Sequence, residues 1–378
     1  MASASPRAVY IHVPFCRHRC GYCNFTLVAG RDDLVPAYLE ALGREMETLG
    51  EPRQVDTIFF GGGTPTHLDF SALEQLLALV RRWFMPSEGY EWSVEANPAD
   101  MTAEKADVLR AAGVTRLSLG AQSFAGGKLA LLERDHAAEA IARAMELARP
   151  RFSSVSLDLI FGAPGETLAA WEADLAAAVA LGPQHMSTYG LTFEKGTTFW
   201  SRLGRGDLAR VPEETERDMY LAAIDQLTAA GFEHYEVSNF ARPGHRCRHN
   251  EQYWLGAEYY AFGPGAARYV QGRREMNHRS TTKYIERVLA GESPVAESET
   301  LAAEDRAREL LVFGLRRLEG VDREWFAART GYEIAALGGE ALPRFIAARF
   351  LEWHGSQLRL TRAGLLVSDA IWPEFLEV

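Results

Sequence analysis

Short apolar stretches alternate with amphipathic stretches from residue 8 to about residue 240. The apolar runs are nearly continuous, as expected for parallel strands that are buried on both faces, and the amphipathic runs have helical spacing. Six such pairs predict a parallel sheet with helices packed outside it. The predicted strands are 8–14, 55–63, 91–97, 114–124, 153–165 and 185–192, and the predicted helices are 34–50, 71–84, 102–113, 137–148, 168–182 and 213–231.

The alternation predicts an α/β fold, a partial parallel (β/α)6 barrel, and in such barrels the functional groups lie at the C-terminal ends of the strands. From about residue 300 the pattern is helix-rich, with a two-stranded wing around Gly355, and resembles a winged-helix module. We therefore expect a barrel core over 1–240, a connecting region over 241–299 and a C-terminal α-rich, winged-helix-like domain over 300–378.

Charge and composition argue against some partners and some cellular locations. A net charge of −11 and a pI near 5.5 argue against nucleic acid as a partner, because phosphate binding needs a basic face. No apolar run is long enough to cross a bilayer, and the start of the chain lacks the apolar core of a secretion signal. Only four cysteines occur, three of them clustered, which predicts a reducing, cytoplasmic location.

The three clustered cysteines, Cys16, Cys20 and Cys23, follow the first predicted strand with the spacing C-x3-C-x2-C. Three thiolates can hold three irons of a [4Fe–4S] cluster and leave the fourth iron open for chemistry. The alternative is a structural zinc ion, which normally takes four protein ligands. The fourth would have to be His18 or Cys247. Spacing alone leaves both alternatives open.

Polar or glycine-rich groups also mark the following strands. Gly61–Gly63 end the second strand, where glycines let a ligand approach the backbone, although a tight turn is the favoured explanation of the glycines taken alone. Glu95, Gln122 and Asp158 belong to the next three strands, and a lone carboxylate in a buried strand is costly unless it is paired. Arg134 can pair with a ligand carboxylate. Together these groups describe a pocket for S-adenosylmethionine next to the cluster.

These motifs are similar to those of the radical S-adenosylmethionine superfamily, and the segments YIHVPFC, FFGGGTPT, VEANP, SLGAQSF and LDLIFGAPGET resemble its oxygen-independent coproporphyrinogen III oxidase-like branch. The resemblance covers most of the chain, including the C-terminal module. It implies that a [4Fe–4S] cluster is bound by Cys16, Cys20 and Cys23. It also implies contacts to S-adenosylmethionine from Tyr10, Gly62, Gly63, Thr64, Glu95, Gln122, Arg134 and Asp158.

Two features separate this chain from the oxidases of the branch. The oxidases resemble C-x3-C-x2-C-x-C, but Phe25 occupies the position of their further cysteine. They also carry a long N-terminal arm, whereas about eight residues precede the first strand here. An oxidase that decarboxylates coproporphyrinogen III nevertheless remains the alternative function, and a radical methyl transferase is also compatible with the motifs. Whether the protein is an enzyme stays open.

The segment CRHNEQYW contains His249-Asn250-x2-Tyr253-Trp254, which resembles a signature of the heme chaperones of this branch. This resemblance implies a protein that binds heme and delivers it to an unidentified acceptor protein, and it is compatible with a homodimer. Imidazole is a standard ligand of heme iron, so His249 is the predicted heme contact, with Cys247 as a rival. Alternatively, His249 caps a turn and the neighbouring aromatics fill a seam. Further groups proposed to face the porphyrin or its propionates are Tyr253, Trp254, Tyr259, Tyr260, Phe262, Arg242, Arg246 and Arg248.

Overall fold

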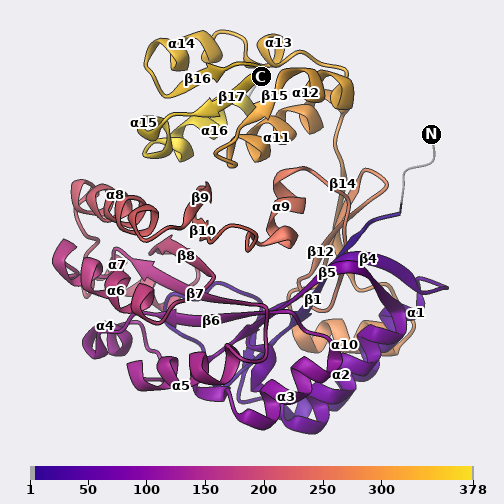
Figure 1. The fold of residues 1–378 in the computed structure, drawn as a ribbon. Coiled ribbons are helices and arrows are strands. Elements are labelled where there is room, and N and C mark those ends of the chain that lie inside the picture. Colours follow the sequence, from indigo (N-terminus) through magenta and orange to yellow (C-terminus); the bar gives the residue numbers. More distant parts are fainter. Residues whose placement is uncertain (1–4, 377–378) are drawn as a thin grey trace.

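The computed structural model describes residues 5–376, and the largest sheet in this range has nine strands in the order β11-β1-β4-β5-β6-β7-β8-β10-β9 (Figure 1). Its central six strands follow one another in chain order, and all neighbours among them are parallel. The predicted parallel β/α barrel is therefore confirmed. The six strands are β1 (Ala8–Val13), β4 (Arg53–Gly62), β5 (Phe84–Ala96), β6 (Arg116–Gln122), β7 (Ser154–Phe161) and β8 (His185–Gly190).

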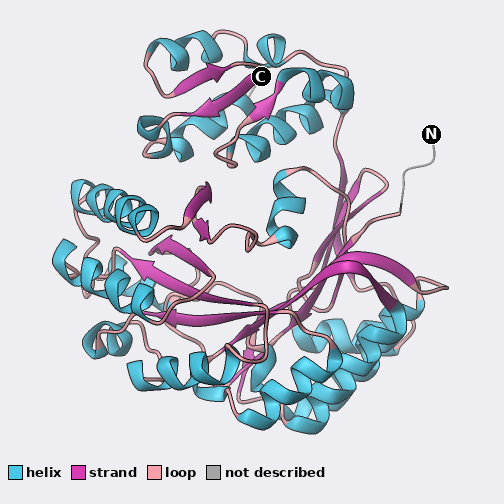
Figure 2. Ribbon diagram, in the orientation of Figure 1, coloured by secondary structure: helices cyan, strands magenta, loops and turns pink. Residues whose placement is uncertain are grey.

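Helices cover the outer face of this curved sheet (Figure 2). Their ends carry the expected signals: Thr102 accepts a hydrogen bond from the Lys105 N–H at the start of α3, and Gly113 ends that helix with a φ of 101°. Trp92 and Phe60 pack edge to face in the apolar layer beneath the helices. The helices are α1 (Val35–Glu47), α2 (Phe70–Trp83), α3 (Ala103–Ala112), α4 (Gly126–Leu131), α5 (Ala138–Ala148), α6 (Leu168–Ala180), α7 (Thr198–Gly204) and α8 (Glu213–Ala229).

Both edges of the six-stranded core are extended by later segments. Residues 233–241 form two short strands separated by a turn, β9 (Glu233–Glu236) and β10 (Asn239–Ala241), and β10 pairs antiparallel with β8. β11 (Tyr260–Phe262), which the sequence analysis did not anticipate, pairs parallel with β1. An uncovered β1 would leave a row of backbone groups unpaired, and β11 satisfies them.

The connecting region adds α9 (Arg248–Trp254), the antiparallel strands β12 (Ala267–Val270), β13 (Arg273–Asn277) and β14 (Val295–Thr300), and α10 (Thr281–Leu289), which packs on α1. Two short strands, β2 (Phe15–Cys16) and β3 (Val28–Ala29), pair beside the barrel mouth. No helix among residues 5–376 is both long and apolar enough to span a membrane.

The C-terminal region forms a helical unit with a three-stranded sheet, and β16 and β17 make the predicted antiparallel wing around Gly355. It contacts the barrel side through an ion pair between Arg362 and Asp225 and through an isolated antiparallel backbone β-bridge between Glu236 and Arg317. Its elements are α11 (Ala303–Leu315), β15 (Val321–Asp322), α12 (Arg323–Thr330), α13 (Ile334–Gly338), α14 (Ala341–Ala347), β16 (Leu351–His354), β17 (Gln357–Leu360), α15 (Arg362–Leu365) and α16 (Ser368–Leu376).

Candidate functional site

The cysteine loop leaves the C-terminal end of β1 and folds over the mouth of the barrel. Cys16 and Cys20 are buried and Cys23 is half-buried, and a turn brings the Cys23 N–H to the Cys20 carbonyl at 3.0 Å. The Cys16 Sγ lies 3.1 Å from the Thr64 hydroxyl. Burial raises the pKa of the free Cys16 thiol to about 12 and also raises the pKa of Cys23. Thiolates in such a place need a bound cation to keep them ionised, which fits a resident metal cluster.

Among residues 5–376, neither candidate for a fourth zinc ligand converges with the cysteines on one metal position. His18 points to Glu133, with 3.9 Å between Nε2 and Oε2. Cys247 is buried against Glu91 of β5, with 3.7 Å between Sγ and Oε1. Within residues 5–376 no three histidine, cysteine or acidic side chains converge closely enough to hold one metal ion. In a [4Fe–4S] cluster, by contrast, each thiolate binds a different iron.

The glycines at the end of β4 are explained by close packing of the backbone. A Cβ at Gly63 would lie 2.7 Å from the Phe15 carbonyl oxygen and 2.9 Å from the Val13 carbonyl oxygen. Gly62 has a φ of 108°, and a Cβ there would lie 2.4 Å from the His12 ring. The strand end therefore presses on the segment that leads into Cys16. The tight-turn explanation holds, and it fixes the cysteine loop against the end of β4.

Two carboxyl groups face the barrel interior. Glu95 accepts a hydrogen bond from the Gly62 N–H at 3.2 Å, and Asp158 accepts hydrogen bonds from the Ser118 hydroxyl at 3.1 and 3.0 Å. Burial, reinforced by the nearby Asp158 charge, raises the pKa of Glu95 to about 8. Burial also raises the pKa of Asp158, although hydrogen bonds from serine hydroxyls oppose the shift. Glu95 is thus protonated near neutral pH until a cation arrives beside it.

Gln122 has a strained backbone, and Gln122 and Arg134 each have a buried polar atom without a hydrogen-bond partner among the described residues, as expected at a ligand site. Gln122 has a φ of 61°, in the left-handed region that costs a non-glycine residue energy. Its buried Oε1 and the Arg134 Nε have no partner among the described residues. Arg134 donates to the Gly120 carbonyl at 3.1 Å and approaches the Cys20 Sγ at 3.6 Å. A ligand with its own donors and carboxylate would satisfy these atoms.

Sequence reasoning missed three parts of this site. Tyr189, at the end of β8, keeps 44% of its surface accessible, and burial together with the nearby charges of Asp158 and Glu95 raises its pKa. Tyr189 could have been predicted, because polar side chains near the C-terminal ends of the other barrel strands were already singled out. The other two are the Ser118 hydroxyl on Asp158, and a buried network of Lys128, Glu166 and Asp174 that holds the chain after Gln122 through Ser123.

His249 is not open to a ligand in this structure. It is 1% exposed, its Nδ1 lies 2.9 Å from the Thr57 hydroxyl, and its Nε2 lies 2.8 Å from the Tyr253 hydroxyl. Burial lowers its pKa to about 3, so the ring is neutral. Ligation of heme iron by His249 stays a prediction, and it would require one of these hydrogen bonds to break. Cys247, the rival ligand, is also buried, and its pKa is raised to about 12 by burial.

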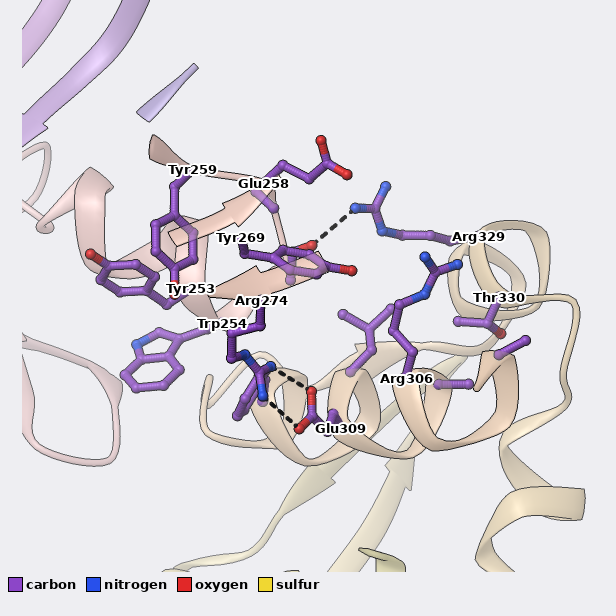
Figure 3. A pocket seen from close by; sticks show the side chains of 16 residues that line it. Tyr253, Trp254, Glu258, Tyr259, Tyr269, Arg274, Arg306, Glu309, Arg329 and Thr330 are labelled. Atoms are coloured by element: carbon purple, nitrogen blue, oxygen red, sulfur yellow. Dashed lines mark hydrogen bonds and ion pairs between the residues drawn. The ribbon is translucent and has the colours of Figure 1, made fainter. Parts of the chain in front are cut away.

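Other groups proposed to face heme also have different surroundings. Tyr260 and Phe262 lie in the core as part of β11. Arg246 pairs with Glu319, Arg248 donates to the Gly89 carbonyl, and Arg242 donates to the Ala230 carbonyl. Of the predicted heme-facing groups, Tyr253, Trp254 and Tyr259 line a cavity outside the barrel (Figure 3).

A continuous series of aromatic rings joins the barrel interior to this cavity. Tyr10 stacks on Phe59 with 6.1 Å between ring centroids, and Phe59 stacks on His249 at 5.2 Å. His249 meets Tyr253 edge to face at 5.1 Å, and Tyr253 meets Tyr259 at 4.7 Å. His249 therefore sits between the predicted cofactor contact Tyr10 and the cavity wall.

Comparison with known proteins agrees with this architecture. Residues 10–178 match the radical SAM superfamily, and residues 301–367 match the HemN C-terminal domain. The solved structure of Escherichia coli coproporphyrinogen III oxidase (HemN), a radical SAM enzyme, aligns with a TM-score of 0.87 over 99% of this chain and 90% of that chain. Its sequence identity is 23%, so it supports the fold alone.

Curated relatives match over the whole chain. The heme chaperone HemW of Bacillus subtilis (strain 168) is 36% identical over 98% of this chain and 99% of its own length. HemW of Escherichia coli (strain K12) is 34% identical over 100% of both chains. HemW of Mycobacterium tuberculosis (strain H37Rv) is 39% identical over 97% of this chain and 94% of its own. The chain therefore belongs to the HemW heme chaperone family within the radical SAM superfamily.

Proposed function

We propose that this protein binds heme and delivers it to an acceptor protein in the cytoplasm. The observation that carries the proposal is the similarity to heme chaperones along the entire chain, including α9 and the C-terminal domain. Phe25 supports it, because the position of the oxidases' further cysteine holds a phenylalanine that is 66% exposed. The acceptor protein is identified only by its need for heme.

The proposal includes a [4Fe–4S] cluster on Cys16, Cys20 and Cys23 and a bound S-adenosylmethionine. The cofactor would supply a radical when reduced by the cluster. Arg134 would pair with its carboxylate, Glu95 would accept from its amine, and the remaining contacts would come from Tyr10, Gly62, Gly63, Thr64, Gln122 and Asp158. The buried atoms of Gln122 and Arg134 that lack partners among the described residues support this placement.

An anaerobic titration with heme, run beside an assay with coproporphyrinogen III, tests the function. We expect about stoichiometric heme binding, seen as a new Soret band, and no protoporphyrinogen. A robust yield of protoporphyrinogen under reducing conditions would instead establish the oxidase alternative.

The pKa of Glu95 predicts how cofactor binding depends on pH. With a pKa of about 8, Glu95 is protonated below pH 8 in the free protein, whereas a cationic amine beside it favours the carboxylate. Binding then releases a proton, so affinity for S-adenosylmethionine should rise by up to about tenfold per pH unit from about pH 6 to pH 8. Calorimetry on the reconstituted protein measures this slope. Glu95→Gln should flatten it, and an unchanged slope in that variant would place the titration elsewhere.

A further inference from the structure

Three ionisable side chains form a buried cluster between α4, α6 and the loop that follows β7. Lys128 keeps 8%, Glu166 keeps 2% and Asp174 keeps 3% of its side chain exposed. The Lys128 ammonium contacts the Glu166 carboxylate and lies 3.1 Å from Asp174 Oδ2. Taking charges out of water is costly, and apolar side chains of similar volume often stabilise a core as well or better. Core stability alone therefore does not account for this cluster.

The cluster fixes the two residues that directly follow Gln122. Asp174 accepts a hydrogen bond from the Ser123 hydroxyl at 2.6 Å and another from the Phe124 N–H at 2.7 Å. Hydrogen bonds to a carboxylate are shorter and stronger than those between neutral groups. Asp174 thus holds the chain just beyond Gln122 in one conformation.

Gln122 itself needs such support. Its φ of 61° costs a non-glycine residue energy, and such a conformation is kept only where the surrounding contacts enforce it. On the other side of Gln122, His136 donates from Nε2 to the Ala121 carbonyl at 3.0 Å. The pairing of β6 with β7 also shifts register between Gly120 and Gln122. The backbone is therefore fixed on both sides of Gln122, while its buried Oε1 lacks a partner among the described residues.

We propose that Asp174 is a positioning residue for S-adenosylmethionine, an inference that rests on the cofactor assignment in the proposed function. Asp174 holds residues 123–124, which keep Gln122 in its left-handed conformation. The unpartnered Oε1 of Gln122 then stays in place to accept a hydrogen bond from the cofactor. Lys128 neutralises the Asp174 charge. This part of the site is formed before the cofactor arrives, so binding does not have to order it.

Calorimetric titration of the full-length, cluster-loaded protein with S-adenosylmethionine tests this role. Asp174→Asn should weaken binding about tenfold, because the neutral side chain holds residues 123–124 less firmly. Lys128 would keep Glu166 as its partner, so the substitution leaves no buried charge alone. Glu172→Gln removes an exposed carboxylate from the same helix, α6, and is the matched control. It should bind the cofactor like the unsubstituted protein.

A double-variant comparison distinguishes positioning from plain structural support. In a Gln122→Ala background, Asp174→Asn should change the affinity by less than about twofold, because the residue that Asp174 positions is gone. Equal losses in both backgrounds would show that Asp174 does not act through Gln122 and would overturn the inference. Amide hydrogen exchange of residues 121–125 in the cofactor-free protein should also become faster in Asp174→Asn, while iron content stays unchanged.

The outcomes separate this inference from the cofactor assignment on which it rests. If the unsubstituted protein binds S-adenosylmethionine and Asp174→Asn binds it as tightly, the positioning role is wrong and the cofactor assignment stands. If the unsubstituted protein binds none, the cofactor assignment fails and the positioning role fails with it. Ser123→Ala removes only one hydrogen bond to Asp174 and should weaken binding severalfold, so it tests the role even if Asp174→Asn does not fold. Unchanged affinity in a folded Ser123→Ala protein, checked by circular dichroism, would contradict the inference as well.

Discussion

Cys20→Ser protein is expected to lose the visible absorbance of the iron–sulfur cluster almost completely after anaerobic reconstitution. With three protein ligands, the loss of one leaves two thiolates to hold the cluster, and a neutral serine hydroxyl is a poor replacement. Arg134, whose Nη1 lies 3.6 Å from the Cys20 Sγ, would keep its other contact with the Gly120 carbonyl. The local fold should therefore persist while the metal is lost.

Cys247→Ser is the matched control for this experiment. Cys247 is a buried thiol beside Glu91, so its replacement should leave iron and sulfide content unchanged. Iron analysis and absorbance spectra of the two variants give the comparison. Full cluster retention in Cys20→Ser, cluster loss in Cys247→Ser, or zinc in place of iron in the unsubstituted protein would each show that the ligand set is wrong.

Gly63→Ala is expected to destabilise the protein by about 2–3 kcal/mol and to lower cluster retention. The added methyl group would meet the carbonyl oxygens of Phe15 and Val13 at 2.7 and 2.9 Å. These are backbone atoms, and the Gly63 N–H is itself bonded to the Val13 carbonyl at 2.7 Å, so neither side can rotate away. Relief requires the chain leading into Cys16 to move, which shifts the first cluster ligand.

Urea denaturation and iron content measure the two effects. Gly127→Ala serves as the control, because nothing lies within 4 Å of a Cβ at this helical position, and alanine there should be neutral or stabilising by up to about 1 kcal/mol. A Gly63→Ala protein as stable and as iron-rich as the unsubstituted one would show that the end of β4 does not support the cysteine loop.

The cavity beside α9 and the cysteine loop lie in different parts of the molecule. The cysteine loop, Glu95 and Asp158 lie at the mouth and interior of the barrel, whereas the cavity with Tyr269 lies between the barrel and α11. The ring series from Tyr10 through His249 is the packed connection between them.

The strand and helix pattern and the position of the cluster loop were predictable because they depend on near neighbours in the chain. A buried parallel strand imposes a continuous apolar run, and C-x3-C-x2-C brings its thiols together in one loop. The link from Gly62 to Glu95 follows from the same logic, because parallel strand ends meet at one edge of a sheet. Tyr189 obeys this rule too and was overlooked at the sixth strand.

Tertiary structure alone decided the surroundings of His249. Its partner Thr57 is 192 residues away in sequence, and both ring nitrogens of His249 make hydrogen bonds inside the core. The sequence motif suggests an iron ligand, but in this structure His249 is a buried residue that links Thr57 to Tyr253. The cavity likewise unites Tyr253, Tyr269, Arg306 and Arg329 from four separate elements. Periodicity and spacing report what each segment must bury. Which segments meet depends on long-range packing, which no local pattern contains.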